Sequence, residues 1–258
     1  MIEKYNARAK EINSLLCVGL DADFDKLPEE FKSLPEPQFA FNVHIIEQTH
    51  QYAAAYKPNA AFYEARGDQG IRELKKTMEY LRSEHPEIYT ILDAKRGDIG
   101  NTNIGYVASI YDWLGFDAIT LHPYMGNESL RPFLDRKDKE SIILCRTSNP
   151  GSSEFQYLVF TDGKPLWLHV AETVAQKWNT NGNCMLVAGA TYPEEMKRIR
   201  TAVGDMPLLV PGIGAQGGDT RAVVEAGQTA DGLGLIIASS RGIIFSNDPA
   251  QAARTLRD

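Results

Sequence analysis

Cysteine is scarce in this chain of 258 residues, which contains only Cys17, Cys145 and Cys184. Each lies inside an apolar run, and none belongs to a Cys-x-x-Cys pair. This spacing argues against a disulfide framework and against a cysteine-built metal site. We therefore expect three reduced, buried thiols, as is usual for a cytoplasmic protein.

Long apolar stretches and an excess of basic residues are also missing. No window approaches the unbroken apolar length of a membrane span, and residues 1–10 lack the apolar centre of a signal peptide. The formal net charge is −7, and the five histidines show no paired metal-ligand spacing. Nucleic acid, an anionic membrane and a histidine-bound metal are therefore not expected as partners.

The chain does contain a regular alternation of short apolar runs and segments with helical periodicity. Eight apolar runs in 258 residues give one run per about 32 residues, close to the length of a βα unit. The runs are 15–20, 54–56, 89–92, 118–121, 141–145, 184–188, 207–210 and 232–238. The helical segments are 39–52, 70–82, 103–113, 129–135, 166–178, 193–203, 219–226 and 249–256.

Apolar strands that alternate strictly with helices are typical of a parallel sheet covered by helices. The first strand leads into Gly19-Leu20-Asp21, not into the Gly-x-Gly-x-x-Gly pattern of an open dinucleotide-binding sheet. No linker or shift in composition divides residues 1–258. The sequence predicts an α/β protein with a single (β/α)8 TIM barrel, whose active site lies at the C-terminal ends of the strands.

A tight charge cluster follows the third predicted strand, where Asp93, Lys95 and Asp98 lie close together in the sequence. Side chains two apart on a strand point the same way, so Asp93 and Lys95 should share a face. Asp21 and Lys57 end the first and second strands. Removing these charged groups from water costs free energy, so a functional site explains them better than an ordinary core does.

Three loops near the predicted barrel mouth are candidates for ligand binding. Residues 211–218 hold four glycines, which let backbone N–H groups approach an anion, and residues 239–242 add Ser240 and Arg241. Barrels often build a phosphate site from their seventh and eighth loops. Residues 148–165 form a connection too long for a plain turn, and we expect a lid there.

Together these motifs resemble the orotidine 5′-phosphate decarboxylases, in particular the longer bacterial (type 2) subfamily. The motifs are Gly19-Leu20-Asp21, Tyr56-Lys57-Pro58-Asn59, the run from Asp93 to Thr102, Thr147-Ser148-Asn149-Pro150-Gly151, and residues 211–218. The resemblance implies a homodimeric barrel that converts orotidine 5′-phosphate to uridine 5′-phosphate and CO2 in pyrimidine biosynthesis. It also implies that neither a metal nor an organic cofactor takes part.

The resemblance assigns roles to individual residues. Lys57, Asp93, Lys95 and Asp98 would form the catalytic network, in which Lys95 stabilises and protonates a carbanion at C6 of the pyrimidine. The substrate-binding residues would be Asp21, Thr102, Ser148, Gly214, Gln216, Ser240 and Arg241. Asp98 and Thr102 would reach into the site of the neighbouring subunit. His122 stands where many relatives have asparagine, and we expect it to be a packed, hydrogen-bonded residue.

Three other interpretations remain open from the sequence. A metal-assisted lyase or aldolase of the same superfamily would use carboxylates for Mg²⁺, but Lys57 would repel the ion. A Schiff-base aldolase needs a neutral lysine, and Lys95 between two acids is a poor nucleophile. A barrel that only senses phosphate would be expected to lack one of the four charged residues, yet all four are present.

Overall fold

The computed structural model describes residues 2–213 and 220–258, and its eight parallel strands close into a barrel in the order β1 to β8. Strand β8 pairs with β1 to complete the ring. This confirms the predicted single (β/α)8 TIM barrel. The strands are β1 (Leu16–Val18), β2 (Ala55–Tyr56), β3 (Tyr89–Arg96), β4 (Ala118–Leu121), β5 (Glu140–Arg146), β6 (Cys184–Ala188), β7 (Leu208–Pro211) and β8 (Leu235–Ser239).

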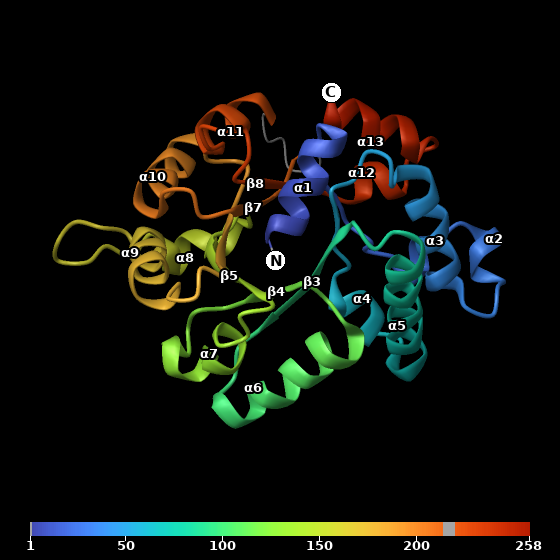
Figure 1. Cartoon of the computed structure of the whole chain (residues 1–258), viewed down its shortest axis with the longest axis horizontal. Helices are drawn as coiled ribbons and strands as arrows, with labels where there is room; N and C mark the ends of the chain where they lie inside the picture. Colours follow the sequence, from blue (N-terminus) through green and yellow to red (C-terminus); the bar gives the residue numbers. More distant parts are fainter. Residues whose placement is uncertain (1, 214–219) are drawn as a thin grey trace.

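Helices follow the strands in sequence and surround the barrel (Figure 1). All eight segments with helical periodicity are helical, although Asp219 lies outside the described residues. The main helices are α3 (Pro37–Thr49), α5 (Gly67–Glu84), α6 (Gly100–Val107), α7 (Gly126–Leu134), α9 (Leu166–Thr173), α10 (Pro193–Val203), α11 (Thr220–Gly227) and α13 (Pro249–Arg257). The π-helical turns η2 (Ala108–Leu114) and η4 (Val174–Trp178) continue α6 and α9.

Several short elements were not predicted from the sequence. They are η1 (Phe24–Lys26), α2 (Glu29–Lys32), α4 (Ala60–Glu64), η3 (Pro150–Ser152), α8 (Ser153–Gln156) and α12 (Arg241–Ile244). Each has five residues or fewer, which is too short for a hydrophobic period to show. In the described part of the chain, no helix combines the length and apolar character that crossing a membrane requires.

The N-terminal helix α1 (Ile2–Ile12) closes the end of the barrel where the strands begin. The hydroxyl of Tyr5 donates to the carbonyls of Leu15 and Leu235, at the starts of β1 and β8. The backbone N–H of Ile2 donates to the carboxylate of Glu140 at the start of β5. These contacts cover the end of the barrel opposite to the predicted site.

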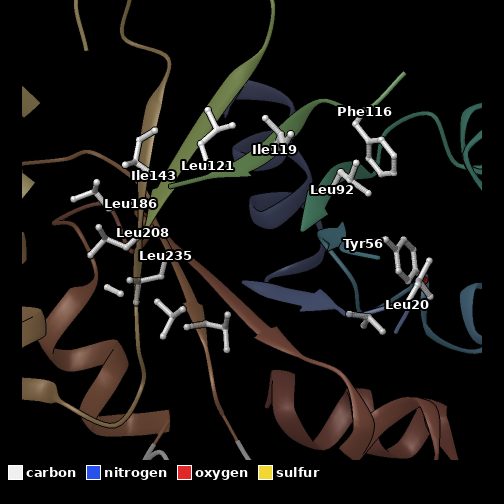
Figure 2. Close-up of a cluster of buried hydrophobic side chains, with 14 of the residues drawn as sticks. Leu20, Tyr56, Leu92, Phe116, Ile119, Leu121, Ile143, Leu186, Leu208 and Leu235 are labelled. Atoms are coloured by element: carbon white, nitrogen blue, oxygen red, sulfur yellow. The ribbon is translucent and has the colours of Figure 1, made fainter. Parts of the chain in front are cut away.

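Side chains along the strands point alternately into the barrel and toward the helices, and this gives two apolar layers. Inward-facing side chains such as Cys17, Ile91 and Ile142 form one buried cluster inside the barrel. Outward-facing side chains pack against the helices, and Figure 2 shows Leu121, Ile143, Leu186, Leu208 and Leu235 from five successive strands in this layer. Both layers are apolar between the two ends of the barrel.

Residues 148–165 contain η3 and α8, followed by an antiparallel bridge between Val159 and Pro165. Leu158, Val159 and Phe160 are exposed along this hairpin. Figure 1 shows the hairpin extending outward beside α9. The lid over the barrel mouth stays a prediction.

Candidate active site

Three charged side chains from two neighbouring strands meet at the barrel mouth. Lys95 Nζ lies 2.6 Å from Asp93 Oδ1, and Lys57 Nζ lies 3.2 Å from Asp93 Oδ2. Asp93 and Lys95 are on β3, and Lys57 directly follows β2. The contact between Asp93 and Lys95 agrees with the shared face that the sequence predicted. Each oxygen of this carboxylate therefore faces one ammonium group.

Burial and charge oppose each other in this cluster. Burial alone would raise the pKa of Asp93, but the positive charges of Lys57 and Lys95 hold it well below its usual range. Burial would lower the pKa of Lys57, but the carboxylates of Asp93 and Asp21 raise it above its usual value. Lys57 is only 6% exposed. Asp93 and Lys57 are therefore both charged at neutral pH although they are largely removed from solvent.

Asp21 lies beside Lys57 on the turn after β1. Its Oδ1 accepts a hydrogen bond of 3.1 Å from the backbone N–H of Asn59, and the N–H of Leu20 donates to the Lys57 carbonyl. The ends of β1 and β2 are thus tied together around the buried ammonium of Lys57. Asp21 remains half-buried, which leaves part of its carboxylate accessible from the mouth.

The sequence gave no indication of the contact made by Thr120 on β4. This threonine is 1% exposed, and its Oγ1 donates a hydrogen bond of 2.8 Å to Asp93 Oδ1. A neutral threonine on an apolar strand carries no signal of a charged site. The contact depends on the register between β3 and β4, which a single sequence does not reveal.

Asp98 does not join the lysine cluster within one chain. Its carboxylate accepts from the N–H of Ile99, and among the described residues neither Lys57 nor Lys95 forms an ion pair with it. The buried Asn103 holds this turn, because its side chain bonds both the N–H and the carbonyl of Asp98. Thr102 is exposed in the first turn of α6. The roles of Asp98 and Thr102 in the site of a neighbouring subunit stay a prediction.

Ser148 follows β5 and is half-buried beside Gly189, which follows β6. A Cβ atom on Gly189 would lie 3.1 Å from both the backbone nitrogen and the Cβ of Ser148, so the glycine permits this approach. The neighbouring Arg146 is buried and bonds the side chains of Ser152 and Glu195. These contacts fix the backbone from which Ser148 projects.

The two predicted phosphate loops are described only in part. Gly214 and Gln216 lie outside the described residues. Gly212 has a φ of 103°, a conformation that favours glycine. Ser240 precedes α12, and its buried Oγ has no hydrogen-bond partner among the described residues. Arg241 is exposed at the start of the same turn, where its guanidinium is accessible to an anion.

His122 packs against the turn that carries Asp98. A Cβ atom at Gly97 would come within 2.8 Å of His122 Nε2, so this glycine makes room for the ring. The backbone N–H of His122 donates to the Arg96 carbonyl. The structure thus agrees with the expectation that His122 is packed, and the hydrogen bond it makes is from its backbone.

No group of three or more histidine, cysteine, aspartate or glutamate side chains within residues 2–213 and 220–258 is arranged to hold a metal ion. The free cysteines Cys17, Cys145 and Cys184 are all buried, as predicted. Burial raises the pKa of each thiol to about 12.

The chain was compared with known families and proteins. Residues 14–256 match the sequence model described as "Orotidine 5'-phosphate decarboxylase / HUMPS family". A protein of Cellvibrio japonicus (strain Ueda107) named orotidine 5′-phosphate decarboxylase is 48% identical over 260 residues, which cover 99% of this chain and 94% of the relative. A protein of the same name from Janthinobacterium sp. (strain Marseille) is 49% identical, with 98% and 93% covered.

Solved structures agree with the sequence relatives. The structure of Leishmania donovani OMP decarboxylase superposes with a TM-score of 0.88 at 42% sequence identity. The match covers 99% of this chain and 95% of that chain. The likeness thus extends over the whole barrel and includes every strand end that bears a candidate site residue.

Proposed function

The chain belongs to the orotidine 5′-phosphate decarboxylase / HUMPS family, and from this premise we propose that it converts orotidine 5′-phosphate to uridine 5′-phosphate and CO2. The observation that carries the proposal is the pair formed by Lys95 Nζ and Asp93 Oδ1 at 2.6 Å, with Lys57 on the other carboxylate oxygen. Full-length relatives at 48% and 49% identity bear the name of this enzyme.

The chemical difficulty of this reaction is a carbanion in the plane of the pyrimidine ring. Loss of CO2 from C6 leaves an electron pair that the π-system cannot delocalise, so catalysis must lower the barrier by roughly 20 kcal/mol. A fixed ammonium next to C6 stabilises this charge as it forms and then donates a proton to it. In our proposal Lys95 does both, and uridine 5′-phosphate is released with that proton at C6.

Asp93 has two effects in the proposed mechanism. It orients the Lys95 ammonium through their direct contact, and Lys57 holds the other oxygen of the same carboxylate. Its negative charge also lies where the substrate carboxylate would bind, and the repulsion is relieved as CO2 leaves. The low pKa of Asp93 supports this role, because the carboxylate keeps its charge at neutral pH.

A metal-assisted lyase fits this geometry less well. Such an enzyme needs carboxylate oxygens open to Mg²⁺. Here both oxygens of Asp93 already face ammonium groups, and one of these belongs to the buried Lys57. A divalent cation at this place would meet strong repulsion from the lysines.

The remaining substrate contacts follow from the resemblance. Asp21 and Lys57 would bind the ribose, and Ser148 the pyrimidine. The loops 211–218 and 239–242 would bind the phosphate through Gly214, Gln216, Ser240 and Arg241. The buried hydroxyl of Ser240, which has no hydrogen-bond partner within residues 2–213 and 220–258, and the exposed guanidinium of Arg241 support this assignment. Binding energy at the phosphate would drive closure of residues 148–165 over the mouth.

We further propose a homodimer in which Asp98 and Thr102 complete the partner's site. Large apolar side chains are exposed just after Asp98, at Ile99 and Ile104, and in the connection after β4, at Tyr124 and Met125. Exposed large apolar side chains of this kind are typical of an interface. A two-fold dimer would bury both copies and exchange the two Asp98 carboxylates symmetrically. The buried thiols support a reducing, cytoplasmic setting.

The proposed activity is tested by following the absorbance change of orotidine 5′-phosphate with purified protein, in the presence and absence of EDTA. We expect the same rate under both conditions, because the site uses lysines in place of a metal. Loss of activity with EDTA that Mg²⁺ restores would assign the chain to the metal-assisted branch. Binding of uridine 5′-phosphate without any turnover of orotidine 5′-phosphate would favour a phosphate-sensing protein.

A further inference from the structure

The pairing of β3 with β4 is irregular at the residues that carry the chemistry. Leu92 pairs with Ile119 and Arg96 pairs with Leu121. Three residues of β3 between these pairs, from Asp93 to Lys95, therefore lie opposite the single residue Thr120 of β4. A bulge of this kind leaves backbone N–H groups without their usual partners in the strand ladder.

The hydroxyl of Thr120 replaces the missing ladder partners. It accepts hydrogen bonds from the N–H groups of Ala94 at 3.1 Å and Lys95 at 3.0 Å. It donates its one proton to Asp93 Oδ1 at 2.8 Å. A hydroxyl has one donor and two acceptor positions, so all of its hydrogen-bonding capacity is used. One buried atom thus contacts three consecutive residues of the bulge.

The backbone at Lys95 is held in an unusual conformation. Its φ is 48°, in the left-handed region that side chains other than glycine rarely adopt. Such a conformation persists only where the surroundings fix it, and it is common at functional sites. The hydrogen bond from the Lys95 N–H to Thr120 is one of those constraints.

We propose that Thr120 is a positioning residue for the decarboxylation: its hydroxyl holds the bulge so that the Lys95 ammonium and the Asp93 carboxylate face the reacting carbon. This inference rests on the proposed function, since it needs the reaction that Lys95 and Asp93 perform. Thr120 acts through its two neighbours and does not itself react. The hydrogen bond that Thr120 donates to Asp93 also helps to keep the pKa of Asp93 low.

The proposal predicts which substitutions preserve activity. Thr120→Ser keeps the hydroxyl and removes only a methyl group. Thr120→Val keeps the shape but removes all three hydrogen bonds, and Thr120→Ala removes them without any risk of overpacking. The hydroxyl and the methyl group can therefore be separated experimentally.

A second buried threonine provides a matched control. Thr90 lies near the other end of β3, and its Oγ1 donates to Asp117 Oδ2 and accepts from the Asp117 N–H. Thr90→Val thus removes a comparable contact between a hydroxyl and an aspartate, here between β3 and the residue that precedes β4. It lies at the closed end, away from Lys95.

The experiment compares kcat and KM for orotidine 5′-phosphate and the affinity for uridine 5′-phosphate in wild type and the four variants. Loss of a hydrogen bond to a charged group predicts that kcat falls about 10- to 100-fold in Thr120→Val and Thr120→Ala. We expect Thr120→Ser and Thr90→Val to keep kcat within about threefold of wild type. KM and product affinity should change little throughout, which shows that the site is folded.

Each other outcome bears on a specific part of the proposal. If Thr120→Val and Thr120→Ala both keep nearly full kcat, the hydroxyl does not position the lysine. If Thr120→Ser loses as much kcat as Thr120→Val, packing of the methyl group is responsible and the proposal is wrong. If Thr90→Val loses as much kcat as Thr120→Val, then loss of any buried threonine hydroxyl in the barrel lowers activity, and Thr120 has no specific positioning role. An inactive wild-type protein would instead overturn the proposed function.

Discussion

At the scale of single residues, the site depends on a carboxylate that remains charged although it is largely buried. The side chain of Asp93 is 14% exposed and contacts two lysines. The sequence predicted that Asp93 and Lys95 share a face, because charge and strand-like residues are visible in a single chain. It did not predict Thr120, because the bulge opposite this residue is set by the pairing of two strands.

The depressed pKa of Asp93 predicts how acid affects stability. A carboxyl with a lower pKa in the folded state than in the unfolded state stabilises the fold above the unfolded value of about 3.9. This contribution is lost as the pH falls through the range below that value. Removing one partner of a buried pair typically costs about 3 kcal/mol, so we expect Asp93→Asn to lose that much stability at pH 7.

Urea unfolding of wild type and Asp93→Asn at a series of pH values measures this effect. The difference in unfolding free energy should stay constant from neutral pH to about 4 and shrink below that, because the carboxyl then takes up a proton in the unfolded chain while the folded protein still holds it ionised. Asp135→Asn serves as a control, since Asp135 pairs with Arg131 on the exposed surface. A gap between wild type and Asp93→Asn that stays constant at every pH would show that charge on Asp93 does not stabilise the fold.

At the scale of elements, the sequence was most informative where a pattern repeats. The eight apolar runs and the eight periodic segments correspond to strands and helices of the barrel. The predicted start of the last helix is also correct, because the Asp248 side chain accepts from the N–H of Gln251 and Pro249 begins α13. Helix α1 was missed because residues 1–10 are polar on average, whereas its buried face is made by a few residues such as Tyr5 and Ala9.

The segment that follows β5 is held by one buried guanidinium. Arg146 Nε lies 2.6 Å from Glu195 Oε2 on α10, and other nitrogens of the group donate to Ser152 and to the Thr147 carbonyl. The guanidinium also lies over the rings of Tyr157 and Tyr192. One residue thus joins β5, the first part of segment 148–165 and α10.

We expect Arg146→Met to reduce the unfolding free energy by about 3 to 5 kcal/mol, because Glu195 loses its buried partner. Arg136→Met is the matched control: this arginine pairs with Asp112 and Asp138 at the surface, where removal of a pair costs about 1 kcal/mol or less. Chemical denaturation of both variants provides the comparison. Equal losses in the two variants would mean that Arg146 does not organise the segment.

At the scale of the whole molecule, the sequence of one chain predicts the barrel, whereas the proposed site also needs residues of a second chain. Within the described part of the subunit Asp98 forms no ion pair with Lys57 or Lys95, and Ile99 and Ile104, which follow it in the chain, are exposed. Periodicity specifies how strands and helices pack within a chain. It does not specify how two copies meet, so the shared site was predicted only from the resemblance to a family.

Mixing two inactive variants tests the shared site. Lys95→Ala and Asp98→Ala chains are combined, allowed to exchange subunits under mild denaturant and refolded. Each hybrid dimer has one site with both substitutions and one with neither, so random exchange should make about a quarter of all sites wild type. Activity should therefore reappear in the mixture. If verified hybrids remain as inactive as the separate variants, Asp98 acts within its own subunit.

The most direct test of the account is the effect of Lys95→Ala on turnover and on binding measured side by side. Because Lys95 acts on charge that exists only in the transition state, this variant should lose measurable decarboxylation of orotidine 5′-phosphate. It should still bind uridine 5′-phosphate with nearly wild-type affinity. A fall in kcat of less than about tenfold together with a sharp rise in KM would instead make Lys95 a binding residue, and the proposed mechanism would be wrong.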